Sequence, residues 1–133
     1  MITAVDTSVL LDVFAEDPTF CARSQAALRS AIREGGLVAC DVVWAEVAAA
    51  FPTAEASATA MGTLGVTFNA ATAAGAAVAG LAWKAYRRRG GPRQRVVADF
   101  LVGAHALTCA DRLLTRDRGF YRTYFPRLSI VEP

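Results

Sequence analysis

Residues 1–14, MITAVDTSVLLDVF, decide the fold class of this chain. Ile2 to Val5 is a short apolar run with a β-branched residue at each end, which predicts a buried strand. Asp6 follows at once, and Thr7 or Ser8 can cap a helix whose apolar residues are Val9, Leu10, Val13 and Phe14. A buried strand that leads directly into a helix is the beginning of a βαβ unit.

The same alternation continues along the chain. Further short apolar runs predict strands at 37–40, 66–68, 113–115 and 128–131. Helices are predicted at 18–32, 70–88, 94–109 and 117–121. Asp41 is expected to cap another helix, which Pro52 interrupts, and a further helix is predicted to end at about Leu64. Strands that alternate with helices predict a parallel sheet covered on both faces. We therefore expect an α/β fold, a three-layer α/β/α sandwich with a short, mostly parallel central sheet. Nothing divides the chain, so we expect residues 1–133 to form one domain.

Composition excludes several classes of protein. The chain is 54% hydrophobic and 20% charged, which excludes a disordered chain. Three cysteines without a CxxC spacing indicate reduced thiols, and the N-terminus lacks the positive flank of a secretory signal. The longest uncharged apolar stretch, around 70–83, is too short to span a bilayer. We expect a cytoplasmic protein that does not enter a membrane.

The charges are distributed unevenly. Residues 1–66 carry eight acidic and three basic side chains, whereas residues 67–133 carry four acidic and eleven basic ones. The basic residues of the second half gather in two clusters, which include Arg87, Arg88 and Arg93 in one, and Arg116 and Arg118 in the other. Clustered arginines favour a polyanionic partner such as nucleic acid. The alternative for Arg87 to Arg89 is a solvated helix end, where arginine complements the helix dipole.

Four acidic residues stand at positions that suit a site. Asp6 and Asp117 follow predicted strands, and functional groups in parallel sheets gather at the carboxyl ends of strands. Glu46 falls early in the helix after the second strand, and Asp99 lies in the apolar run VVADFLV. Each acid taken alone is more often a structural partner of an arginine or a helix cap. A carboxylate among apolar residues is harder to explain in that way, because an unpaired buried charge is costly.

If the four acids converge, a cation is needed to offset their repulsion. Carboxylates and water suit Mg²⁺ or Mn²⁺, and the single histidine and dispersed cysteines offer no zinc site. Such a cation activates water and stabilises the charge that develops when a phosphodiester is hydrolysed. The acidic site and the basic clusters would then serve one function.

Four segments and the tail carry a resemblance to a known family. They are VDTSVLLD at 5–12, VVWAEV at 42–47, ADFLVGAHA at 98–106, LLTRDRGFY at 113–121 and YFPRL at 124–128. In this order and spacing, the chain resembles PIN-domain ribonucleases, and most closely the VapC toxins of toxin–antitoxin pairs.

The resemblance implies roles for particular residues. Asp6 and Asp99 would be the principal metal ligands, Asp117 would complete the acidic pocket directly or through water, and Glu46 would hold a second metal or orient water. Ser8 and Thr115 match small hydroxyl positions beside these acids. The implied activity is Mg²⁺-dependent endoribonuclease cleavage of RNA, and the implied partners are a small VapB-type antitoxin and a second copy of the chain in a homodimer.

Other conspicuous residues are expected to be structural. His105 lies more than one and a half helical turns past Asp99, so we expect it to pack or cap rather than catalyse. Trp44 and Trp83 are expected in the core or at an interface, and Asp12 is expected to be a surface charge.

Rival functions have weaker support in the sequence. A haloacid dehalogenase-type phosphotransferase needs a second Asp two residues after the first, where this chain has Ser8, and it needs a late lysine. A receiver domain needs an acidic pair near the first strand and also a late lysine, whereas the only lysine is Lys84. The alternative that stays open is a non-catalytic RNA- or protein-binding module with the same fold, which would bind no divalent ion.

Overall fold

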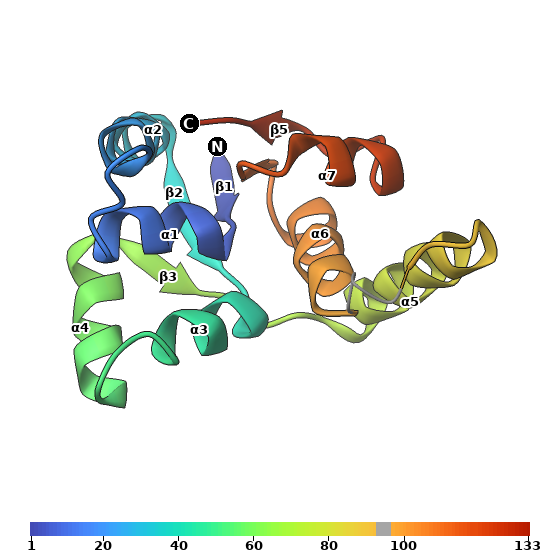
Figure 1. Ribbon diagram of the computed structural model, residues 1–133, viewed down its shortest axis with the longest axis horizontal. Helices are drawn as coiled ribbons and strands as arrows, with labels where there is room; N and C mark the ends of the chain where they lie inside the picture. The colour runs from blue at the N-terminus through green and yellow to red at the C-terminus, as the bar shows by residue number, and fades with distance from the viewer. Residues whose placement is uncertain (93–96) are drawn as a thin grey trace.

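The fold is a five-stranded sheet with helices on both sides, as the sequence predicts. The computed structural model describes residues 1–92 and 97–133. The strands are β1 (Ile2–Val5), β2 (Gly36–Ala39), β3 (Val66–Phe68), β4 (Arg112–Leu114) and β5 (Ile130–Val131). The helices are α1 (Thr7–Phe14), α2 (Cys21–Glu34), α3 (Asp41–Ala48), α4 (Ala54–Thr63), α5 (Ala73–Arg88), α6 (Val97–Cys109) and α7 (Arg118–Tyr124). Each predicted strand and helix is present, with shifted ends (Figure 1).

The order in which the strands are added to the sheet reverses at β1, the central strand. The order is β3-β2-β1-β4-β5, and every pair is parallel. The chain moves outward from β1 to β3 and then returns to the other side of β1 as β4. In open parallel sheets, binding sites form outside the carboxyl ends of the strands at such a reversal. The topology therefore predicts a functional site at the residues that follow β1 and β4.

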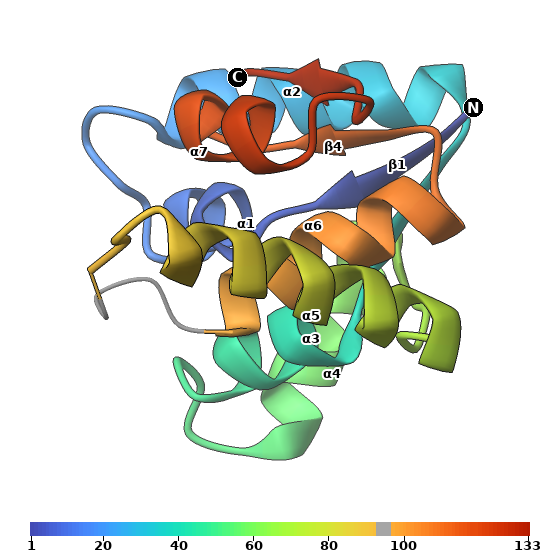
Figure 2. The same cartoon turned by 90° about the vertical axis from the view of Figure 1, so that its right-hand side faces the viewer.

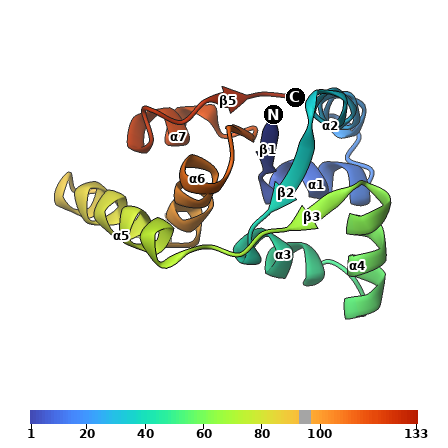
Figure 3. The same cartoon turned by 180° about the vertical axis from the view of Figure 1, so that it is seen from behind.

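The helices form two layers. Figure 2 shows α2 on one side of β1 and β4, with α5 and α6 on the other side, and Figure 3 shows the same separation from behind. The central strands β1 and β4 are mostly buried between these layers: Val5, Leu113 and Leu114 are each 1% exposed or less. This burial on both faces explains why the strands are short apolar runs rather than alternating ones.

Close packing fixes α6, the helix that carries Asp99. A Cβ added to Gly103 would lie 2.5 Å from the ring of Phe125, so only glycine lets the aromatic ring sit against the helix here. Phe100 of the same helix packs edge-on against Phe120 of α7. The first turn of α6 is thereby held against the segment that follows β4.

Two local expectations are wrong. Asp6 is itself the N-cap of α1, because its Oδ1 accepts a hydrogen bond of 2.8 Å from the amide of Thr7, and neither Thr7 nor Ser8 is the cap. Asp41 is the first residue of α3 rather than its cap, and its Oδ1 accepts a bond of 3.2 Å from the amide of Ala71. Over residues 1–92 and 97–133, no helix is both long enough and apolar enough to cross a bilayer.

Candidate metal and nucleic-acid site

Asp6 is the centre of the candidate site. It ends β1 and begins α1, so its backbone is fixed by the sheet on one side and by the helix on the other. Its Oδ2 accepts a hydrogen bond of 2.7 Å from Thr115 Oγ1 and a longer one of 3.4 Å from the hydroxyl of Tyr121. Asp6 therefore joins the carboxyl ends of the two central strands, β1 and β4, across the reversal in strand order.

Burial dominates the electrostatics of Asp6. It raises the pKa of this carboxyl above its ordinary value, while the hydrogen bonds from Thr115 and Thr7 act in the opposite direction. The carboxylates of Asp99 and Glu46 raise the pKa of Asp6 further. Asp99 and Glu46, although far from Asp6 in the sequence, therefore both act on the charge of Asp6 in the folded chain.

Glu46 reaches the site through a threonine. It lies on α3 with its side chain largely exposed, and its Oε1 accepts a hydrogen bond of 2.9 Å from Thr7 Oγ1. Thr7 directly follows Asp6, so this bond fixes the position of α3 relative to the first turn of α1. The sequence analysis proposed Thr7 only as a cap, and its bond to Glu46 spans 39 residues of chain.

Asp117 joins the site from the segment after β4. Its amide donates a hydrogen bond of 3.0 Å to Thr115 Oγ1, the same hydroxyl that donates to Asp6. Thr115 is fully buried, and Asp117 is half-buried at the start of α7. One buried hydroxyl thus connects the two acids that follow β1 and β4. Ser8, the other predicted hydroxyl, lies half-buried in the first turn of α1.

The donor set suits a hard divalent cation that keeps much of its water. Within the described ranges, no three His, Cys, Asp or Glu side chains are grouped so that they could hold a metal ion. Mg²⁺ commonly binds proteins through one or two carboxylates and completes its coordination with water and substrate phosphates. Asp6 with Asp99 fits that mode, whereas a closed cage of protein ligands does not fit.

The second basic cluster lies against this site. Arg116, between Thr115 and Asp117, donates a hydrogen bond of 3.0 Å from Nη2 to Asp12 Oδ1, and its guanidinium lies 4.1 Å from the centre of the Phe20 ring. Arg118 forms an ion pair of 2.9 Å with Glu132. Asp12 is only 3% exposed and also accepts a bond of 2.8 Å from Ser24 Oγ. The expectation that Asp12 is a surface charge is therefore wrong.

The first basic cluster lies at the end of α5. Arg87 and Arg88 are exposed, and together with Trp83 and Lys84 they line a shallow cavity of about 490 Å³. The guanidinium of Arg87 lies 5.8 Å from the ring of Trp83, so this arginine is held along the helix surface. Arg93, the remaining predicted RNA contact, lies outside the described residues.

Histidine and tryptophan take structural positions. His105 is 2% exposed, and its Nε2 lies 2.8 Å from Asn69 Oδ1. Burial lowers the pKa of His105, which favours the neutral ring. Trp44 and Trp83 are partly buried against the core. The indole nitrogen of Trp83 is the only buried side-chain nitrogen or oxygen among the described residues that lacks a hydrogen-bond partner.

Comparison with known proteins agrees with this geometry. The family model described as the PIN domain matches residues 3–126. The fold is similar to the structure of VapBC2 from Rickettsia felis bound to a DNA fragment from their promoter, with a TM-score of 0.76, 17% identity and coverage of 99% of this chain and 98% of that chain. It is also similar to VapBC-1 from nontypeable Haemophilus influenzae, with a TM-score of 0.74, 18% identity and coverage of 99% and 98%.

A third similar structure is that of FitAB bound to an IR36 DNA fragment. The TM-score is 0.71 at 20% identity, and the match covers 100% of this chain and 95% of that chain. No curated protein sequence matches the chain. At these identities the solved structures establish the fold and no more.

Proposed function

Because the chain belongs to the PIN-domain family, we propose that it is a metal-dependent endoribonuclease and the toxin component of a toxin–antitoxin pair. The observation that carries the proposal is the position of Asp6: it lies at the strand reversal, is bonded to Thr115 of the neighbouring strand, and is repelled by the carboxylates of Asp99 and Glu46. Repelling carboxylates at this place in a parallel sheet favour a cation-dependent site over a purely structural one.

Each of the four acidic residues has a proposed role in holding a metal ion or positioning water. Asp6 and Asp99 would hold Mg²⁺ or Mn²⁺, Asp117 would complete the pocket directly or through water, and Glu46 would hold a second metal or orient the attacking water. A bound divalent cation lowers the pKa of its water and stabilises charge on the phosphate. Thr115 keeps one oxygen of Asp6 in place, and Thr7 keeps Glu46 turned toward the same region.

RNA is the proposed substrate, and arginine side chains are the proposed contacts to its phosphates. Arg116 and Arg118 flank Asp117 in the sequence, Arg87 and Arg88 lie at the end of α5, and Arg93 belongs with them to the first basic cluster of the sequence. Guanidinium groups match phosphate oxygens in charge and geometry. Arg116 and Arg118 are adjacent to Asp117 in the sequence, so we expect their cluster to contact the phosphate nearest the acids.

The proposed protein partner is a small VapB-type antitoxin. The solved structures with this fold include VapBC complexes, which supports a partner of that kind. An arginine of the antitoxin would pair with the acids around Asp6 and block access to them. We further propose a single domain over residues 1–133, a homodimer, and a cytoplasmic location for the pair.

The direct test of the activity is cleavage of RNA by the purified protein. We expect single-stranded RNA to be cut in Mg²⁺ or Mn²⁺ and to stay intact when the metal is chelated, with defined ends on sequencing. Expression in a host without an antitoxin should slow growth. If metal-loaded protein leaves all RNA intact and expression leaves growth unchanged, the proposal fails.

A second candidate function follows from the metal-site geometry. This candidate is a non-catalytic RNA- or protein-binding module of the same fold, and its support is that Asp6 already accepts hydrogen bonds from Thr7 and Thr115, as an acid with a structural role would. Calorimetric titration with Mn²⁺ separates the two candidates. The nuclease should bind the ion at a site that Asp99→Asn weakens, whereas the binding module should show no such heat.

A further inference from the structure

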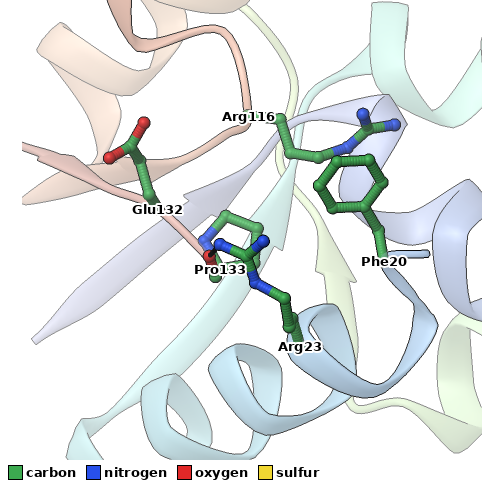
Figure 4. A pocket seen from close by; sticks show the side chains of 5 residues that line it. All are labelled: Phe20, Arg23, Arg116, Glu132 and Pro133. Atoms are coloured by element: carbon green, nitrogen blue, oxygen red, sulfur yellow. Dashed lines mark hydrogen bonds between the residues drawn. The ribbon is translucent and has the colours of Figure 1, made fainter.

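A pocket beside the acids is not explained by the proposed metal site. Its lining comes from Phe20, Arg23, Arg116, Glu132 and Pro133, and its volume is about 220 Å³ (Figure 4). Two of the five residues are arginines, whose side chains reach the pocket from the start of α2 and from the segment after β4.

The pocket lies at the same edge of the sheet as the acids. Arg116 directly follows Thr115, whose hydroxyl donates to Asp6. Glu132 and Pro133 follow β5, which pairs in parallel with β4, and the amide of Thr115 donates to the carbonyl of Val131. The pocket therefore opens at the carboxyl ends of β4 and β5, next to the end of β1 where Asp6 lies.

Arg116 is held in place before any ligand arrives. Its guanidinium is bonded to the buried carboxylate of Asp12 and stacked on Phe20, as Figure 4 shows for the ring. Its side chain still has an exposed fraction of 34%, which leaves part of the fork open to the pocket. A guanidinium fixed in this way loses little conformational entropy when it binds an anion.

Arg23 is the more adaptable of the two arginines. It is exposed, its guanidinium lies 5.6 Å from the Phe20 ring, and its Nη2 donates a hydrogen bond of 2.9 Å to the main-chain carbonyl of Pro133. A phosphate oxygen between the two arginines would accept charge-assisted hydrogen bonds from both guanidinium groups, whereas the Pro133 oxygen accepts one from Arg23. The negative charge of Glu132 at the pocket is offset by its ion pair with Arg118.

We propose that this pocket binds a phosphate of the RNA substrate that neighbours the phosphate to be cut, with Arg23 and Arg116 as its ligands. The inference rests on the proposed function, because the ligand is the substrate of that same site. Arg23 thereby sets which stretch of the RNA backbone lies over the acids, so it is a substrate-positioning residue.

The test measures RNA affinity in Ca²⁺, so that cleavage is suppressed. We expect Arg23→Ala to raise the Kd for a labelled single-stranded RNA about tenfold at low salt and to reduce the slope of log K against log salt by about 0.7, the value for one lost phosphate contact. Arg29→Ala is the matched control, because Arg29 is an exposed arginine of the same helix that lies outside the pocket. Arg23→Lys, which keeps the charge, should give an intermediate Kd.

RNA in which a single phosphate carries no charge identifies the phosphate that Arg23 contacts. RNA in which one phosphate at a time is replaced by a methylphosphonate should bind the parent more weakly at the contacted position, and that same replacement should weaken binding by Arg23→Ala less, because only Arg116 then contacts that phosphate. This coupling is expected at a single phosphate next to the cleaved one. Equal effects of Arg23→Ala and Arg29→Ala, or a loss spread equally over all phosphates, would overturn the pocket assignment.

The two proposals fail separately. If the parent cuts RNA but Arg23 shows no coupling to any phosphate, the pocket assignment is wrong and the nuclease stands. If the coupling is found but the parent cuts no RNA, the nuclease is wrong, and the pocket is a phosphate contact of a protein that binds RNA without cutting it. Absence of any RNA binding by the parent would overturn both.

Discussion

Thr115 donates a hydrogen bond of 2.7 Å to Oδ2 of Asp6, and the two residues follow the two adjacent central strands, β4 and β1. The same hydroxyl accepts a bond from the amide of Asp117. A single buried side chain therefore sets the spacing between the two acids that end these strands, and it lowers the pKa of Asp6 against the effect of burial.

Removal of the Thr115 hydroxyl should change the environment of the Asp6 carboxylate without creating a cavity in the core. Thr115→Val keeps the shape of the side chain, but it deprives Asp6 Oδ2 and the amide of Asp117 of their partner. We expect the pKa of Asp6 to rise further and the free energy of unfolding to fall by about 1–2 kcal/mol. Carbon-detected NMR titration of the Asp6 carboxyl measures the first effect. Thr115→Ser, which keeps the hydroxyl, should leave that pKa close to the parent value, and an unchanged pKa in Thr115→Val would contradict this role.

Asp6 should destabilise the metal-free fold at neutral pH. Its pKa in the folded state is raised above the ordinary value of 3.8, so its contribution to stability is fully present below that value and is lost as the pH rises through the folded pKa. Asp6→Asn removes the charge and keeps an acceptor for the amide of Thr7. We expect this variant to melt at a higher temperature than the metal-free parent at pH 7, and the difference to vanish near pH 3. Thermal melts across this range in chelator check the sign, and a variant less stable at pH 7 would refute it.

Arg116 should be required for the stability of the fold as well as for RNA binding. Arg116→Ala leaves the carboxylate of Asp12 buried without its cation, and we expect a loss of about 1–3 kcal/mol in the free energy of unfolding. Adding Asp12→Asn to this variant removes the unpaired charge and should restore part of the loss. Urea denaturation of both variants measures the change in the free energy of unfolding. Arg118→Ala is the control, since its partner Glu132 is exposed, and it should cost less than about 1 kcal/mol. Equal losses for the two single variants would contradict the difference in burial.

His105 should affect stability and leave catalysis alone. Burial lowers its pKa below the ordinary value of 6.5, so its contribution to stability is present above that pH and is lost as the pH falls through the folded pKa. His105→Gln keeps a donor for Asn69 and cannot become charged. We expect it to flatten the decline in melting temperature below pH 6.5 and to keep the RNA cleavage rate at pH 8 within about twofold. A loss of cleavage of 10²-fold or more, the range for a missing general base, would assign His105 to the chemistry.

Most of the fold could be predicted from the sequence. The strands are mostly apolar runs of two to four residues, and β1 and β2 are followed directly by the N-cap residues of helices, Asp6 and Cys40, so these signals are local. The family prediction is also confirmed, because the PIN-domain model matches residues 3–126. The N-cap of α1 was misplaced because Asp, Thr and Ser stand in succession, and all three are good caps.

The site was only partly predictable, since its partners are distant in the sequence. The chain order and the strand-end rule brought out Asp6 and Asp117, whereas the environment of Asp12 depends on Arg116, which is 104 residues away. Asp12 lies six residues after Asp6 in the first helix, and nothing in the neighbouring sequence indicates that its side chain is buried. Tyr121, which reaches Asp6 across 115 residues, was missed for the same reason, although it lies within the segment 113–121.

We propose that Asp6 and its neighbouring acids form a metal-dependent centre that cuts RNA. The most direct measurement is the rate of RNA cleavage in Mg²⁺ by Asp99→Asn, which keeps the side-chain shape and removes one carboxylate of the pair. Glu55→Gln removes an exposed negative charge of α4 and serves as the control. We expect Asp99→Asn to lose cleavage by at least about 10²-fold while it stays folded, and Glu55→Gln to cut like the parent. Cleavage by folded Asp99→Asn at the parent rate would contradict it.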